Sequence, residues 1–147
     1  MAELAKLLDT STLSEVMKKR DPGVERRARE YLEAHGRFTF SILTRFEVLR
    51  GLYAKKAESQ IERFESLCAM SEILPLTDPI VVKGAQIYAE LRDRGRMIDD
   101  ADILIAATAM VSGLSLVTEN LAHFERVPDL ECESWRTPKT KPDSQDA

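Results

Sequence analysis

The sequence predicts an α/β protein of three layers, in which helices cover both faces of a central, mostly parallel sheet of four to five strands. Short apolar segments typical of strands alternate with longer segments of helical period along the chain, and this alternation favours a parallel sheet between two helical layers. The segment 101–111 is apolar apart from Asp102 and Thr108, which predicts a helix buried on nearly all sides. With 147 residues, the chain is long enough for one domain with a substantial core.

The composition sets broad limits on function. A hydrophobic content of 44% and a charged content of 31% are typical of a globular protein. The net charge of −4 gives no overall attraction to nucleic acid, so any such binding would depend on local basic patches. No apolar run approaches the roughly 18 residues of a membrane span, and no signal-peptide pattern begins the chain. We therefore expect a cytoplasmic protein that does not contact the membrane.

The first strand is expected at residues 4–8, and Asp9 follows it directly. A strand that breaks into Asp-Thr-Ser and then a helix puts Asp9 at the carboxyl end of the strand, where open α/β sheets bind ligands. Capping of the next helix by Asp9 or Ser11 is the alternative interpretation.

Two helices should follow, at about 11–19 and 24–34, and the basic residues between 18 and 29 favour a solvated face over a phosphate-binding one. Residues 37–41 alternate as a strand, and a helix is expected from about 43 to 55. Within that helix Glu47 lies beside the apolar arc, so we expect its carboxylate to point inward. The alternative is a partly exposed Glu47 paired with Arg45 or Arg50.

The second half of the chain repeats the alternation. A helix is expected at 57–70, an edge strand at 72–76 with Pro75 near its end, and a long helix from Pro79 to the basic turn before Arg96. The buried helix should stop at Gly113, before a strand at 114–117 and a weak last strand at 130–134. We predict one domain over residues 1–135 and a disordered tail over 136–147, because the tail is rich in Pro, Lys, Asp, Ser and Gln.

Three acidic residues fall at related places in this arrangement. Asp9 ends the first strand, Glu47 lies on the helix after the second, and Asp102 opens the buried helix. If the first and fourth strands are neighbours, these carboxylates meet at one edge of the sheet, where they repel one another unless a cation lies among them. Oxygen ligands alone favour Mg²⁺ or Mn²⁺. Such a site suits phosphoryl chemistry, in which the metal activates a water.

Several segments resemble known motifs, in order and at family-like spacing. They are residues 7–14 (LLDTSTLS), 44–51 (TRFEVLRG), 102–109 (DILIAATA), 113–118 (GLSLVT) and 123–127 (HFERV). Together they resemble the PIN-domain nucleases, especially the VapC-like toxins of prokaryotic toxin–antitoxin pairs. The resemblance spans nearly the whole domain and depends on the ordered set rather than on any single motif.

The resemblance implies that Asp9, Glu47 and Asp102 are catalytic and bind Mg²⁺ or Mn²⁺. Ser11 and Thr118 would hold ligands or water in place. The residues expected at the margin of the site are Asn120, where many family members carry a fourth acid, Asp99, which either caps the helix or binds a metal-bound water, and His123, as a structural neighbour. Asn120 carries no charge, so one firmly bound metal is favoured over two.

The implied function is a metal-dependent endoribonuclease that acts as a toxin. An antitoxin protein would occlude the acidic cleft, and homodimerisation through the helices after Asp9 and around Glu47 is also implied. Arg92, Arg94 and Arg96 are candidates for holding the RNA backbone. The alternative is a non-catalytic PIN-like module that binds RNA or protein. Phosphotransfer domains fit poorly, because Ser11 stands where a dehalogenase-like motif needs a second Asp.

Overall fold

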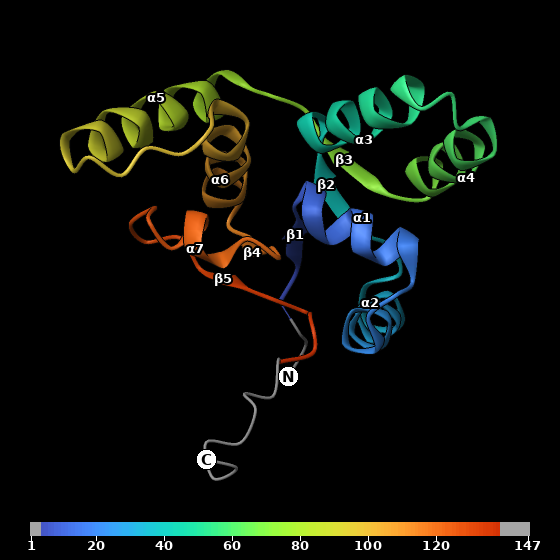
Figure 1. Ribbon diagram of the computed structural model, residues 1–147. Coiled ribbons are helices and arrows are strands. Elements are labelled where there is room, and N and C mark those ends of the chain that lie inside the picture. Colours follow the sequence, from blue (N-terminus) through green and yellow to red (C-terminus); the bar gives the residue numbers. More distant parts are fainter. Residues whose placement is uncertain (1–3, 139–147) are drawn as a thin grey trace, which may run out of the picture.

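Residues 4–138 are described in the computed structural model of this protein (Figure 1). Within that part the sheet has five strands, all paired in parallel, in the order β3-β2-β1-β4-β5. The strands are β1 (Lys6–Leu8), β2 (Thr39–Ser41), β3 (Glu72–Leu74), β4 (Ser115–Val117) and β5 (Cys132–Glu133). The predicted fold class is confirmed. β1 and β4 are neighbours, which meets the condition for Asp9 and the end of the fourth strand to share one edge of the sheet.

Helices connect the strands and cover the sheet. They are α1 (Thr10–Lys18), α2 (Pro22–His35), α3 (Ile42–Ala54), α4 (Glu58–Ala69), α5 (Asp78–Asp93), α6 (Asp100–Ser112) and the single turn α7 (Leu121–Phe124). In Figure 1, α5 and α6 lie on one side of the sheet and α1 to α4 lie on the other. The expected three layers are therefore present.

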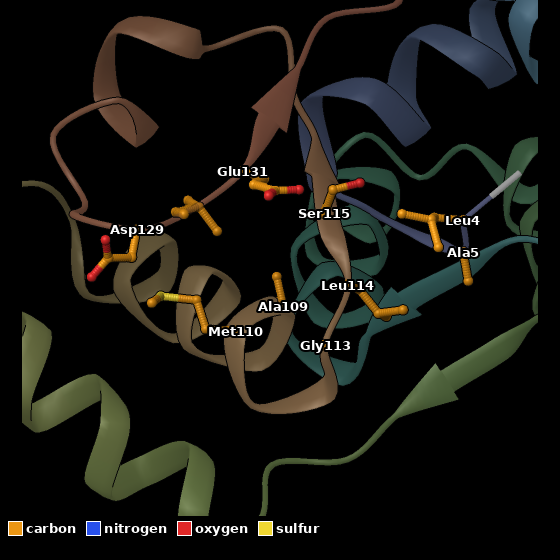
Figure 2. A pocket seen from close by; sticks show the side chains of 10 residues that line it. Leu4, Ala5, Ala109, Met110, Gly113, Leu114, Ser115, Asp129 and Glu131 are labelled. Atoms are coloured by element: carbon orange, nitrogen blue, oxygen red, sulfur yellow. The ribbon is translucent and has the colours of Figure 1, made fainter.

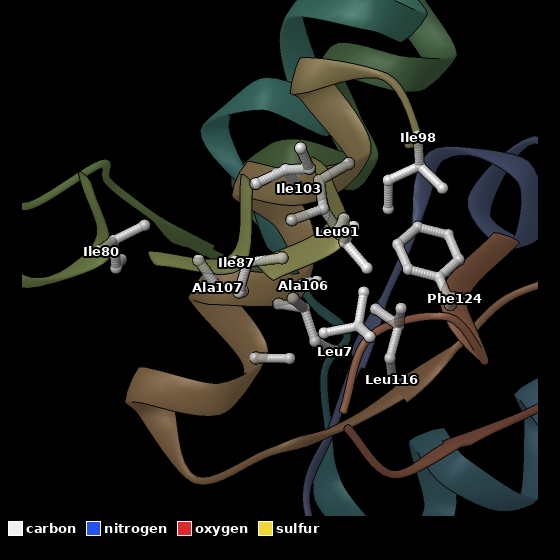
Figure 3. Packing of buried hydrophobic residues seen from close by; sticks show 13 residues of the cluster. Leu7, Ile80, Ile87, Leu91, Ile98, Ile103, Ala106, Ala107, Leu116 and Phe124 are labelled. Atoms are coloured by element: carbon white, nitrogen blue, oxygen red, sulfur yellow. The ribbon is translucent and has the colours of Figure 1, made fainter. Parts of the chain in front are cut away.

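The strand register divides the apolar side chains between two cores. Leu7 is paired with Leu116 and Leu8 with Val117, and neighbouring residues of a strand point to opposite faces of the sheet. Leu7 and Leu116 accordingly pack beneath α5 and α6, and Figure 3 shows them meeting Ile87, Leu91 and Ala106. Leu8 and Val117 pack on the other face, in a core that also contains Phe40, Phe64 and Trp135.

Local sequence signals explain where the helices begin and end. Ser41 caps α3 by accepting the Leu43 N–H at 3.0 Å. Asp21 does the same for α2, which begins with the favoured first-turn Pro22. Gly113 ends α6 with a φ of +69°, the left-handed conformation that glycine adopts most easily. These signals hold Asp102 in the first turn of a helix whose later residues are buried.

Two features of the chain differ from the sequence-based expectation. α7 was not anticipated, because one helical turn is too short for a periodic pattern; Phe124, which is fully buried, fixes it to the core. Residues 136–138 belong to the described part, and the Thr137 hydroxyl donates to Asp21 at 2.9 Å. Residues 139–147, the rest of the expected disordered tail, lie outside the described residues. No helix among the described residues is long and apolar enough to span a membrane.

Candidate active site

Asp9 and Thr118 follow neighbouring strands and meet at the carboxyl edge of the sheet. β1 ends at Leu8 and β4 at Val117, and the two strands pair in register. The Asp9 N–H continues this pairing by donating to the Val117 carbonyl at 3.0 Å. The pairing of the strands therefore places the two polar side chains beside each other.

The Asp9 carboxylate is buried and accepts hydrogen bonds from three donor groups. Only 4% of the residue is exposed. It accepts the Thr12 N–H at 2.8 Å, as a helix cap does, and also the hydroxyls of Ser11 and Thr118. Ser11 Oγ lies 2.8 and 3.0 Å from the two carboxylate oxygens. Its single proton can be donated to only one of them at a time. One lone pair of Asp9 is thus free for another ligand, so the cap and site interpretations are compatible.

Backbone donors fix the direction of both hydroxyls. The Glu119 N–H donates to Ser11 Oγ at 3.1 Å, and the Asn120 N–H donates to Thr118 Oγ1 at 2.9 Å. Each hydroxyl therefore receives one proton and turns its own proton toward Asp9. The loop after β4 thus orients the donors around Asp9, and each donor favours the ionised carboxylate.

Glu47 reaches the same region from α3. Its Oε1 accepts the Thr10 hydroxyl at 2.6 Å, so the carboxylate is held next to the residue that follows Asp9. Its other oxygen lies 3.6 Å from Arg50, and its side chain is 20% exposed. Glu47 therefore points inward and also pairs with Arg50, while Arg45 pairs with Glu65 instead.

Asp102 enters the site from the first turn of α6. Its Oδ2 lies 3.6 Å from Nδ1 of His123, and the side-chain amide nitrogen of Asn120 is 2.7 Å from the same imidazole nitrogen. Because one imidazole nitrogen cannot accept the amide proton and donate to the carboxylate at the same time, His123 lies between the two groups and bonds to one of them at a time. Asp99 occupies the N-cap position of α6 but makes no capping hydrogen bond with its side chain, so the expected capping role is wrong for that side chain. Asp99 is exposed beside the site.

The charges of these acids act on one another. Burial raises the pKa of Asp9 above its ordinary value of 3.8, although its hydrogen bonds oppose the rise. Burial also raises the pKa of Asp102, the bond from His123 opposes this, and the negative charges of Asp9, Glu47 and Asp99 raise it further. The carboxylates predicted from sequence therefore lie within electrostatic reach of one another.

The donor set suits a hard divalent cation, because the acids offer carboxylate oxygens and the nearby neutral groups offer hydroxyl and amide oxygens. Within residues 4–138, however, no three Asp, Glu, His or Cys side chains are grouped closely enough to hold one ion as they stand. The carboxylates approach one another without closing into a ligand cage. The mutual repulsion that raises the pKa of Asp102 is the property that a bound cation would relieve.

The basic residues at the end of α5 lie before the helix that carries Asp102. Arg94 pairs with Glu90 at 3.0 Å, whereas Arg92 and Arg96 are exposed. Their role in RNA binding stays a prediction.

Sequence reasoning missed two contributors to the site. Thr10 orients Glu47, and Glu119 supplies a backbone donor to Ser11. Thr10 follows Asp9 at the start of a helix, and this position could have indicated a role in the site. Nothing in the sequence marks Glu119, because its contribution comes from the backbone and from a contact with the distant Ser134.

A hollow of about 280 Å³ lies at the opposite end of the sheet (Figure 2). Leu4, Leu114 and Ser115 line it at the start of β1 and β4, together with Met110 and Glu131. None of the predicted site residues lines it.

Comparison with known proteins agrees with this geometry. Residues 6–130 match the PIN domain family. Ribonuclease VapC1 of Methanocaldococcus jannaschii is 37% identical over 123 residues, covering 84% of this chain and 81% of that protein. The crystal structure of DNA-bound VapBC from Salmonella typhimurium superposes with a TM-score of 0.80 at 28% identity, covering 90% of this chain and 99% of that one. A toxin–antitoxin complex from Klebsiella pneumoniae gives a TM-score of 0.65 at 25% identity, over 86% of this chain and 95% of that one.

The matched segment contains the three residues predicted to be catalytic, Asp9, Glu47 and Asp102, and also Asn120. The resemblance inferred from the ordered motifs is therefore confirmed over most of the chain. The chain belongs to the PIN domain family.

Proposed function

We propose that this protein is a metal-dependent endoribonuclease that hydrolyses RNA phosphodiester bonds and acts as the toxin of a toxin–antitoxin pair. The observation that carries the proposal is that Thr10 ties the Glu47 carboxylate to the residue next to Asp9, at the carboxyl end of β1. Asp102 lies in the first turn of α6, and burial together with the charges of Asp9 and Glu47 raises its pKa. The names of the relatives support the same activity, since the protein from M. jannaschii is called a ribonuclease.

In this proposal Asp9, Glu47 and Asp102 hold Mg²⁺ or Mn²⁺. The bound ion would supply a water of lowered pKa and positive charge opposite the scissile phosphate. Ser11 and Thr118 keep the Asp9 carboxylate oriented and ionised. Asn120 offers an uncharged amide at the margin of the site and lies 2.7 Å from the imidazole nitrogen of His123 that also faces Asp102.

RNA would approach the acidic edge of a protein whose net charge is −4. Positive side chains near that edge would offset the repulsion, and the exposed Arg92 and Arg96 are the nearest candidates in sequence to Asp102, with Arg94 partly engaged by Glu90. The substrate implies a cytoplasmic location.

The proposed partners are an antitoxin and a second copy of the chain. The similar structure from K. pneumoniae is a toxin–antitoxin complex, so we infer that a small antitoxin covers the acidic cleft of this protein with a basic side chain. Exposed aromatic residues on α3, Phe46 and Tyr53, support a dimer through the helix that carries Glu47. The helix after Asp9 exposes no large apolar side chain, so α5, which exposes Val81 and Tyr88, is the better second candidate.

Cleavage of a mixed cellular RNA pool by purified, antitoxin-free protein tests the activity. The reactions contain Mn²⁺, Mg²⁺ or EDTA, and an Asp9→Asn variant controls for contaminating nuclease. We expect discrete fragments that require the metal and are absent with the variant. Folded protein that leaves every RNA intact would contradict the ribonuclease proposal and favour a non-catalytic binding module.

A further inference from the structure

Residues 134–137, which we name the C-terminal clasp, follow β5 and run from the carboxyl edge of the sheet to the start of α2. They lie beyond the segment that matches the PIN family, which ends at residue 130. At one end Trp135 is 2% exposed within the core. At the other end Thr137 bonds to Asp21 through its hydroxyl at 2.9 Å and its N–H at 3.1 Å. The clasp is therefore fixed at both ends.

The clasp also holds the side chain of Glu119. The Ser134 hydroxyl donates to Glu119 Oε2 at 2.8 Å, and Nε of Arg136 lies 3.4 Å from the same oxygen. Arg136 also lies 3.7 Å from Glu15 on α1. The clasp thus joins the loop after β4 to α1, the helix that Asp9 caps.

The burial of the Glu119 carboxylate lowers the stability of the folded protein. Its side chain is 6% exposed, and its Oε1 is buried with no hydrogen-bond partner among the described residues. A buried carboxylate with one unbonded oxygen lowers stability relative to an apolar residue. The same residue, however, supplies the backbone N–H that donates to Ser11, which in turn donates to Asp9. The contacts that hold the Glu119 side chain therefore also hold its backbone N–H in position to donate to Ser11.

We propose that the clasp positions the loop after β4. Ser134 and Arg136 act as positioning residues that fix Glu119 and, through Ser11, the Asp9 carboxylate. This inference rests on the proposed metal-dependent activity. It assigns a role in the site to a segment outside the family match, and it predicts that loosening the clasp weakens metal binding without unfolding the protein.

A purely structural role predicts a different result. The Arg136 side chain is 43% exposed but its partner Glu119 is 6% exposed, so removal of Arg136 leaves a buried carboxylate with one partner fewer and lowers stability. A loss of stability alone does not change the affinity of the folded protein for a cation. Electrostatics alone also predicts the opposite sign, because removing a positive charge beside an acidic site would strengthen binding of a cation. Weaker metal binding in an Arg136→Ala variant is therefore expected only if Arg136 positions the loop.

The experiment measures Mn²⁺ affinity by calorimetry, together with kcat, KM and the thermal midpoint, for wild type, Arg136→Ala and Ser134→Ala. The matched control is Arg37→Ala, which removes a 58% exposed arginine paired with Glu72 away from the loop. We expect both clasp variants to bind Mn²⁺ about 10-fold more weakly, a typical cost of losing a group that orients a metal ligand. KM should stay close to that of the control. The thermal midpoint should fall more for Arg136→Ala than for Ser134→Ala, because only Arg136→Ala removes the charge that faces the buried Glu119 carboxylate.

Equal or tighter Mn²⁺ binding by Arg136→Ala, with unchanged binding by Ser134→Ala, would overturn the clasp proposal. Ser134→Ala removes one hydroxyl and no charge, so it decides the matter even if Arg136→Ala folds poorly. Wild-type protein that neither binds Mn²⁺ nor cleaves RNA would instead refute the proposed function, and the two failures are thus distinguishable.

Discussion

At the scale of single residues, Asp9 combines a structural and a chemical position. Its carboxylate caps α1 through the Thr12 N–H and also faces the acidic edge of the sheet. The hydroxyls of Ser11 and Thr118 offset part of the cost of its burial, because each donates to the charged form. Loss of either hydroxyl should therefore reduce RNA cleavage more than it reduces the stability of the fold.

Replacement of Thr118 by Val tests this. The shape is kept, but the donor to Asp9 and the acceptor for the Asn120 N–H are lost. We expect RNA cleavage to fall roughly 10–100-fold. Thr108→Val is the matched control, because Thr108 is equally buried and its hydroxyl bonds only within its own helix, to Leu104 at 2.7 Å. Equal activities of the two variants would refute a role for the Thr118 hydroxyl.

The raised pKa values of Asp9 and Asp102 predict how metal-free protein responds to pH. Because both values lie above the ordinary 3.8, the folded state retains protons that the unfolded state has lost. Stability from these groups is present at low pH and is lost as pH rises through the raised values. An Asp9→Asn variant lacks the part of this pH-dependent loss of stability that comes from Asp9. Urea unfolding in EDTA from about pH 4 to about pH 8 should therefore show the variant gaining on wild type as pH rises; a constant difference would contradict the prediction.

At the site, the sequence predicted the identity of the acids better than their surroundings. Asp9, Glu47 and Asp102 were assigned as a set through the resemblance to PIN-domain motifs, since each carboxylate taken alone had another interpretation. The choice between capping and ligand roles for Asp9 could not be made from sequence, since both need the same side chain at the same place. Contacts such as Ser134 with Glu119 depend on strands that meet only after folding.

At the scale of elements, two helical glycines differ in their surroundings. A Cβ at Gly51 on α3 would meet nothing within 4 Å, whereas a Cβ at Gly84 on α5 would lie 3.0 Å from the Leu104 side chain on α6. Gly51→Ala should therefore stabilise the protein by about 1 kcal/mol through helix propensity. Gly84→Val should destabilise it by about 1–3 kcal/mol through overpacking.

Chemical denaturation of the two glycine variants measures both effects. A loss of stability in Gly51→Ala would show that this glycine, which belongs to a family-like motif, has a further role. A neutral Gly84→Val would show that α5 and α6 can move apart at little cost.

Most elements were predictable because each had a local signal. Ser41, Asp21 and Gly113 mark helix ends in the sequence and in the structure. The strands were predicted longer than they are, since apolar residues such as Leu4 and Leu76 continue the pattern although both are exposed. α7 had no periodic signal, and its position depends on the packing of Phe124.

At the scale of the whole molecule, the net negative charge and the acidic edge predict that the proposed cation stabilises the fold as well as supporting activity. A ligand that binds only the folded state stabilises it, by about 2.7 kcal/mol at 100 times its Kd. Mn²⁺ should therefore raise the thermal midpoint of wild type, and Asp9→Asn should respond much less. An equal rise in both proteins would place the ion elsewhere than beside Asp9.

The exposed apolar residues of α3 and α5 belong to the same scale, because they concern assembly. Phe46 and Tyr53 are separated by two turns on α3, as Val81 and Tyr88 are on α5, so each helix presents an apolar stripe, with exposed fractions of 43–62%.

Light scattering should give the mass of a dimer for wild type and of a monomer for a protein carrying both Tyr53→Asp and Tyr88→Asp, because a buried unpaired charge opposes association. Met70→Asp is the control, since Met70 is 74% exposed at the end of α4 and should leave the dimer intact. Wild-type protein that stays monomeric at high concentration would refute the dimer, and dissociation by Met70→Asp would move the interface to α4.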